Sequence, residues 1–532
     1  MRRERAGSVG DSKVEAMLME EPQTLRRTGV RRRASIAVLA GAVLAGACAT
    51  AGPGGVPTGG PAAVSVATPR TPDRTVRPAV GEAPDVTLPP LQEFTLPNGL
   101  RVVVMEKRDL PLVHLNLLIH SGSEADDAGR PGLASITAAM LEEGAAGMSA
   151  LELADAFEYL GARFGVNAGH HVTGMVLRAE TRRFPEALTL AGSVLLQPDF
   201  PEAELERLRL ERLTALVRQH DEPAAVAGVL FDRTLFGVEH AYGRSAFGTE
   251  ASLRAVTTAD LRGFYRVHYR PNNATAVLVG DIDLVTAERL LGEALGGWQR
   301  GDVPAIRVAD REQVRGRTIH VVDMPGSAQS VIRLGRIGAP RTTEDYYALN
   351  VMNVILGGSF TSRLMQNLRE DKGYTYGASS FFNFLPASGP WSAGAAVQTN
   401  ATGPALAEFM NELRGMHQPI PAEEVARARN FLAMQAPAAF QSVAATAAQI
   451  GEVVQYRLPA DYFNHYVDNI LAVTAADVER VARQYIDPDN VAIVVVGDRA
   501  AIEQQIRDQD LGPIRFLEVR DVLGPVPEPG AR

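Results

Sequence analysis

Two stretches of the sequence are copies of one another, and this repeat constrains the fold more than any other feature. Residues 256–281 (VTTADLRGFYRVHYRPNNATAVLVGD) align without a gap with residues 473–498 (VTAADVERVARQYIDPDNVAIVVVGD). Each copy predicts a helix with a Thr cap, a Pro-x-Asn turn and a buried strand that ends at Gly-Asp. We therefore expect a chain built from two similar halves.

Further matches extend the repeat over most of the chain. Opening strands and a charged helix recur, at 99–106 with 318–325 and at 200–209 with 420–429. We expect an α+β fold of two homologous units, 92–300 and 316–515, each an antiparallel sheet with helices on one face. A doubly wound parallel sheet fits poorly, because no Gly-rich phosphate loop follows an early strand.

The first 48 residues predict an export signal. Arginines precede an apolar run from Ile36 to Ala49, which is too short to span a bilayer but fits a secretory signal. The run contains LAGAC, which resembles the lipobox of bacterial lipoproteins, so Cys48 is the expected lipidation residue. An ordinary cleaved signal is the alternative. Either signal places the protein in the periplasm or cell envelope, with a lipid anchor in the first case.

Composition separates the folded part from its flanks and excludes some partners. Residues 49–91 are expected to be a linker, because the stretch 51–90 has nine Pro and six Gly. Residues 516–532 are expected to be a tail. The first 47 residues hold nine Lys or Arg against five Asp or Glu, so their removal changes the net charge from −9 to −13. This charge argues against a nucleic-acid partner. Cys48 is the only cysteine, which excludes intrachain disulfides and CxxC metal sites.

Three long blocks resemble the N-terminal half of insulinase/pitrilysin-type peptidases, the family of the mitochondrial processing peptidase. They begin LPNGLRVVVMEK at residue 96, LEEGAAGMSALE at residue 141 and HAYGRSAFGTEA at residue 240. The resemblance covers about residues 92–515. It implies the mitochondrial processing peptidase-like fold, with the two units arranged as half of a clamshell.

Active members of this family carry an HxxEH motif, in which two His bind zinc and the Glu is the general base. Here the five positions are Ser135, Ile136, Thr137, Ala138 and Ala139, so Ser135, Ala138 and Ala139 replace the functional types. The region expected to supply the third ligand, residues 213–218, contains no acid. The comparison implies no metal and no catalytic residue of the chain's own.

Other residues do not restore a catalytic site. His170 and His171 are adjacent, and on a strand adjacent side chains point to opposite faces, so we expect partly exposed strand-end residues. His240 is expected to order a loop by hydrogen bonding. Ser135 lies in no GxSxG elbow, which argues against a serine nucleophile.

Residues 356–382 (LGGSFTSRLMQNLREDKGYTYGASSFF) resemble the family's C-terminal signature. The resemblance implies that Arg369 and Tyr376 bind the substrate backbone and help to stabilise the tetrahedral intermediate. A guanidinium and a phenol can both donate hydrogen bonds to a carbonyl or oxyanion. The alternative is that Arg369 pairs with Glu370, Asp371 or another nearby acid while Tyr376 packs in the sheet.

In the family's two-chain members, one subunit carries HxxEH and the other carries the Arg/Tyr pair. The resemblance therefore implies the non-catalytic, substrate-binding subunit of a periplasmic heterodimeric zinc metallopeptidase that acts on flexible peptides. Zinc is expected in an HxxEH-bearing partner subunit, and the chain is expected not to be an enzyme on its own. The alternative is a peptide-binding or scaffold pseudopeptidase of the cell envelope with no role in hydrolysis.

Overall fold

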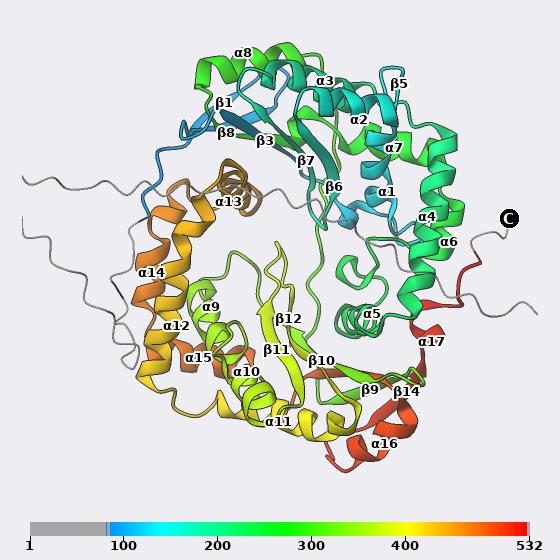
Figure 1. Ribbon diagram of the computed structural model, residues 1–532, viewed down its shortest axis with the longest axis vertical. Coiled ribbons are helices and arrows are strands. Elements are labelled where there is room, and N and C mark those ends of the chain that lie inside the picture. The colour runs from blue at the N-terminus through cyan, green and yellow to red at the C-terminus, as the bar shows by residue number, and fades with distance from the viewer. Residues whose placement is uncertain (1–80, 82–85, 529–532) are drawn as a thin grey trace, which may run out of the picture. The chain divides into compact units, whose positions relative to one another are not determined.

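The computed structural model describes residue 81 and residues 86–528 (Figure 1). Contacts divide the chain into Met1–Arg77 and Pro78–Arg532. The first part lies outside the described residues, and with it the predicted export signal and the lipidation of Cys48. Among the described helices, none combines the length and the hydropathy needed to cross a membrane.

The N-terminal half contains a six-stranded sheet in the order β1-β2-β8-β3-β7-β6. The strands are β1 (Gln92–Thr95), β2 (Arg101–Glu106), β3 (Leu112–Ile119), β6 (Arg163–Ala168), β7 (Thr173–Glu180) and β8 (Ala274–Gly280). The α-helices are α1 (Leu133–Met140), α2 (Ala150–Tyr159), α3 (Phe184–Leu196), α4 (Glu202–His220), α5 (Pro223–Phe236), α6 (Glu250–Ala255), α7 (Thr258–His268) and α8 (Leu284–Leu295). Shorter elements are η1 (Ser123–Ala125), η2 (Leu141–Glu143), η3 (Ala241–Gly243), η4 (Pro271–Asn273) and the hairpin of β4 (Gly144–Ala145) and β5 (Met148–Ser149).

The C-terminal half contains a second six-stranded sheet, in the order β11-β12-β10-β13-β9-β14. The strands are β9 (Thr318–Asp323), β10 (Gln329–Ile337), β11 (Thr375–Phe382), β12 (Pro390–Gln398), β13 (Ala492–Gly497) and β14 (Ile514–Glu518). The α-helices are α9 (Tyr346–Leu356), α10 (Arg363–Met365), α11 (Thr402–Gly415), α12 (Ala422–Gln435), α13 (Val443–Tyr456), α14 (Tyr466–Ala472), α15 (Ala475–Tyr485), α16 (Arg499–Arg507) and α17 (Val519–Leu523). Shorter elements are η5 (Gln366–Asp371), η6 (Thr399–Ala401), η7 (Ala436–Phe440) and η8 (Tyr462–Asn464).

The repeated sequence forms the same elements in both halves. Thr257 and Thr474 begin α7 and α15, and each forms a capping box with an Asp three residues later. The strands that follow, β8 and β13, are buried throughout. The predicted α+β fold of two homologous sheet-and-helix units is confirmed.

The sheets are mixed, which differs from the purely antiparallel sheets predicted. β2 pairs in parallel with β8, and β9 pairs in parallel with β13 and β14. β8 joins β2 only after the chain has passed through almost the whole half, and parallel neighbours require such a crossover connection. The remaining pairs in the two large sheets are antiparallel.

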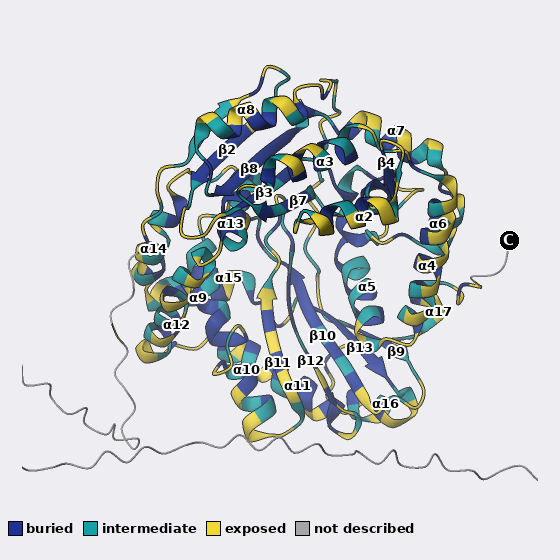
Figure 2. Ribbon diagram, turned by 45° about the horizontal axis from the view of Figure 1, so that its top comes forward, coloured by how far each residue is buried: buried dark blue, intermediate teal, exposed yellow. Residues whose placement is uncertain are grey.

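Two corresponding helices are exchanged between the halves. α5 packs on β10 and β13 of the C-terminal half, and α13 packs on β3 and β8 of the N-terminal half (Figure 1). Side chains of β8 alternate accordingly: Ala276 and Leu278 join the core of their own half, whereas Val277 and Val279 pack with α13. The exchange explains why the central strands are buried on both faces (Figure 2).

Both flanks of the predicted units take part in packing. At the end of the predicted linker, Leu88 donates its N–H to Asn464 Oδ1 (2.9 Å) and accepts from Asn464 Nδ2 (3.4 Å). After residue 515 the chain completes β14 and forms α17, which packs on α5. The end of the linker therefore contacts η8, which follows α13, and the C-terminal segment contacts α5.

Candidate functional site

Helix α1 carries residues 135–139, the five positions predicted to correspond to HxxEH. Its first turn is fixed by Asp126, whose two carboxylate oxygens accept the N–H groups of Gly132 (2.7 Å) and Ala134 (2.8 Å). Gly132 has φ +89, and a Cβ there would lie 2.7 Å from Gly248 Cα, so the turn requires glycine. Burial raises the pKa of Asp126 to about 6, although these two hydrogen bonds oppose the increase.

The helix buries three of the five motif positions and offers no metal-binding set. Ser135 and Ala139 are partly exposed and lie one turn apart on one face. Ala138 is 1% exposed, and Thr137 is buried with its hydroxyl bonded to Leu133 O. A hydroxyl and two methyl groups replace two imidazoles and a carboxylate. The donor set at these positions does not fit zinc.

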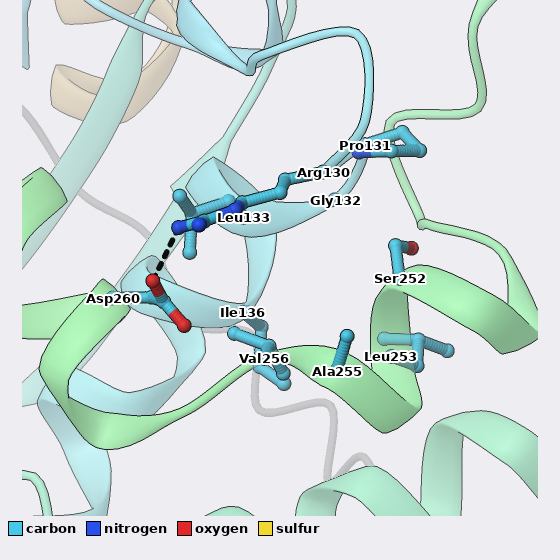
Figure 3. A pocket seen from close by; sticks show the side chains of 10 residues that line it. All are labelled: Arg130, Pro131, Gly132, Leu133, Ile136, Ser252, Leu253, Ala255, Val256 and Asp260. Atoms are coloured by element: carbon cyan, nitrogen blue, oxygen red, sulfur yellow. Dashed lines mark hydrogen bonds and ion pairs between the residues drawn. The ribbon is translucent and has the colours of Figure 1, made fainter.

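The hollow beside α1 is small and mostly apolar (Figure 3). It has a volume of about 100 Å³, and Ile136, the second motif position, lines it. Its only acid, Asp260, forms an ion pair with Arg130 (Figure 3). Among the residues that the structure describes, no group of three or more His, Cys, Asp or Glu is placed to hold a metal ion.

Helix α4 supplies no third zinc ligand within residues 213–218. Leu213 and Leu216 are buried, and the neighbouring Arg212 stacks on Phe247 at 5.0 Å. Glu211 is exposed and pairs with Arg207. The surface of α4 near α1 is therefore apolar or basic.

The two adjacent histidines lie in the turn between β6 and β7, not at a strand end as predicted. Both are partly exposed, as predicted. His170 Nδ1 is 3.1 Å from Ser123 Oγ, and His171 Nε2 is 2.7 Å from Tyr242 Oη. Each ring therefore has its own hydrogen-bond partner, although both rings pack against Tyr242, at 5.7 and 5.5 Å.

Behind this turn is a buried polar cluster that sequence reasoning missed. Glu124 lies 4.0 Å from His171, and Tyr242 Oη also accepts the N–H of Ala387 from the C-terminal half. Burial raises the pKa of Glu124 to about 7 and lowers that of His171 to about 4. The only sequence signal was the presence of Glu124 in the acidic GSEADD stretch, residues 122–127.

His240 orders the η3 loop, in agreement with the sequence prediction. Its Nδ1 accepts the N–H of Tyr242 (3.1 Å), and its Nε2 lies 2.8 Å from Ala309 O. The ring also stacks on Phe236 at 5.1 Å. With both ring nitrogens occupied, this residue is a loop anchor.

Arg369 and Tyr376 come together in the C-terminal half. Arg369 lies on η5, a π-helical turn, and Tyr376 lies near the start of β11. The guanidinium carbon of Arg369 is 4.8 Å from the centre of the Tyr376 ring and 4.6 Å from that of Phe360. The guanidinium therefore lies over both aromatic rings.

The local backbone presents Tyr376 to solvent. The register of β11 against β12 shifts between Thr375 and Ala378, and such an irregularity redirects side chains. Tyr376 is 86% exposed, whereas Tyr374 packs against the core of its half. The proposed alternative in which Tyr376 packs in the sheet is therefore wrong, although Arg369 does contact Glu370 at 3.3 Å.

Two family models match the chain. Residues 101–238 match "Insulinase (Peptidase family M16)", and residues 255–432 match "Peptidase M16 inactive domain". Together the matched segments cover more than half of the chain.

Similar proteins include two uncharacterized zinc proteases. One, from Streptomyces coelicolor, is 27% identical over 303 residues, which are 55% of this chain and 64% of that protein. The other, from Rickettsia bellii, is 23% identical over 407 residues, which are 75% of this chain and 96% of that protein.

Solved structures share the fold. A peptidase M16 inactive domain from Pseudomonas fluorescens has a TM-score of 0.72 at 28% identity, with 76% of this chain and 97% of that chain covered. The periplasmic protease PqqL from Escherichia coli has a TM-score of 0.65 at 17% identity, with 81% and 52% covered. At that identity the second likeness concerns the fold alone.

Proposed function

The chain belongs to the insulinase peptidase family, M16, and on this premise we propose that it is the non-catalytic, substrate-binding subunit of a heterodimeric zinc peptidase. Its substrates are flexible peptides, and its place of action is the periplasm or cell envelope. The observation that carries the proposal is the contrast between two sites. The α1 positions lack a zinc-binding set, whereas Arg369, which is partly exposed, lies beside the 86% exposed ring of Tyr376.

The division of chemistry follows from the side chains. The HxxEH partner subunit supplies zinc and the general base. In this chain the exposed hydroxyl of Tyr376 and the guanidinium N–H groups of Arg369 that do not face Glu370 can donate hydrogen bonds to a peptide carbonyl. Donors aimed at a developing oxyanion each accelerate such reactions by about a hundredfold or more. This stabilisation requires no nucleophile from the chain itself.

The test is reconstitution. The full chain is purified alone and together with the HxxEH protein encoded nearest to it, and both samples are assayed for zinc and for cleavage of a quenched flexible peptide. We expect cleavage only in the mixture. Cleavage and stoichiometric zinc in the chain alone would refute the assignment of the α1 positions.

Variants of the Arg/Tyr pair then separate the proposal from the scaffold alternative. Arg369→Ala and Tyr376→Phe should lower the cleavage rate of the mixture by about a hundredfold and at least severalfold, respectively. Tyr159→Phe is the matched control, since Tyr159 is 81% exposed on α2 of the other half. An unchanged rate in the Arg369→Ala/Tyr376→Phe double variant would favour a scaffold with no role in hydrolysis.

A further inference from the structure

Each large sheet has two edge strands, β1 and β6 in the N-terminal half and β11 and β14 in the C-terminal half, and β6 and β11 take the same place in their sheets. The outer side of such a strand carries main-chain N–H and C=O groups that another extended chain can pair with. A peptide could therefore add as a further strand at either β6 or β11.

On the outer side of β11, Ser380 is covered partly by main chain. Ser380 donates its N–H to Gly357 O (3.1 Å), and its carbonyl accepts from Asn353 Nδ2 (2.9 Å). Gly357 approaches so closely that a Cβ there would lie 2.4 Å from Ser380 N. Because Gly357 binds through its main chain at the end of α9, its carbonyl is fixed by the fold.

The outer side of β6 is closed by a side chain instead. Val166 pairs with Met175 of β7 but donates its N–H to Glu142 Oε1, at 2.8 Å. Glu142 follows α1 in η2 and is partly exposed. Its carboxylate stands where the carbonyl of an added strand would accept this N–H, and rotation about its side-chain bonds can withdraw it.

A groove beside this contact has room for the side chains of an added strand. It has a volume of about 660 Å³, and its lining includes Glu142, Phe157 and Phe164. The two rings are stacked at 4.5 Å and form an apolar wall. Burial raises the pKa of Glu142, which indicates that the carboxylate is held in surroundings poorly suited to its charge.

We propose that Glu142 is a displaceable occupant of the β6 edge, which an extended peptide must remove in order to pair with Val166. The inference rests on the proposed peptide-binding function. The carboxylate withdraws to solvent, and a peptide carbonyl takes its place. Because Glu142 competes with every extended peptide, it sets the affinity of the edge without favouring one sequence.

The test measures peptide affinity in the full chain. The probe is a fluorescein-labelled unstructured peptide of alternating Val and Ser residues, followed by fluorescence anisotropy. Removing the competitor in Glu142→Ala should tighten binding by about tenfold, the range expected for one hydrogen bond to a charged group. Glu142→Gln retains an oxygen acceptor and should tighten binding less.

The control is the adjacent carboxylate. Glu143 pairs with Arg207 of α4 at 2.5 Å, so Glu143→Ala should leave peptide affinity unchanged. Hydrogen exchange should also show faster exchange of residues 163–168 in free Glu142→Ala than in the wild type, and protection of the same residues on peptide binding.

The outcomes distinguish this inference from the function on which it rests. Equal or weaker peptide binding by a folded Glu142→Ala, with wild-type binding intact, would overturn the displacement alone. Absence of peptide binding in every variant would overturn both the displacement and peptide recognition by this chain.

Discussion

Helix α1 and the Arg369–Tyr376 surface present their functional positions in opposite ways. At α1 the family's zinc-binding positions hold small side chains, and Ala138 is 1% exposed. At the second surface Tyr376 is 86% exposed, and Arg369 lies between two rings. The first region is explained by the packing of the fold. The second is not, because an exposed ring adds little to folding.

The contacts that hold α1 in place do not involve the positions that bind zinc in active members of the family. Asp126 caps α1 through main-chain N–H groups, and Ile136 and Met140 pack into the core. None of these contacts involves the positions that bind zinc in active members. The helix can therefore form with Ser and Ala at those positions.

The largest effect should come from restoring the acid of the motif. Ala138→Glu places a carboxylate at a buried position and should lower the free energy of unfolding by about 3 kcal/mol or more. Ala139→Glu, at the partly exposed neighbour, should cost less than about 1 kcal/mol. Urea denaturation of both variants measures the difference. Equal stabilities would show that α1 has room for the lost chemistry and would break the comparison.

A smaller effect, dependent on pH, should come from Glu124 beside α1. Its pKa is about 7 in the folded chain against 4.5 in the unfolded chain. The folded state therefore holds a proton that the unfolded state releases, and the free energy of unfolding falls as the pH rises from 4.5 to 7. Glu124→Gln should remove this decrease and be more stable than the wild type by about 2 kcal/mol at pH 8.

Denaturation of both proteins at pH 4.5 and pH 8 measures this difference. His171 contributes the opposite slope below pH 6.5, because its pKa is lowered to about 4, but it does so in both proteins. The difference between variant and wild type therefore isolates Glu124. Parallel pH profiles would mean that the carboxylate is ionised at no cost, and the region around α1 would then be less closed than its burial indicates.

The smallest effect should come from the second ring beside Arg369. Phe360→Ala removes one face of the aromatic stack, worth about 0.5–1 kcal/mol, and should lower the cleavage rate of the reconstituted enzyme by roughly three- to fivefold. Its thermal stability should not change, because Phe360 is 61% exposed. Phe381→Ala, a 47% exposed position on β11, is the control. Equal rates in the two variants would mean that Phe360 does not contribute to the function of the surface, which would then consist of Arg369 and Tyr376.

The repeat, the helix starts and the two sites with their residue types could all be predicted from the sequence. Thr257 and Thr474 cap their helices through contacts three residues away, and such short-range contacts leave a local pattern. The predicted loss of the two His and the Glu of HxxEH, at Ser135, Ala139 and Ala138, also comes from the sequence, because the motif is defined by residue identity and spacing. The roles of Arg369 and Tyr376 remain predictions.

Only the tertiary structure decided how distant segments meet. The exchange of α5 and α13, the parallel pairing of β2 with β8, and the approach of Glu124 to His171 each join residues far apart in the chain. The contact of Glu142 with Val166 crosses 24 positions, and the proposed opening of the β6 edge rests on it. Local propensity does not predict such pairings, because they form when whole faces of sheets and helices are buried against one another.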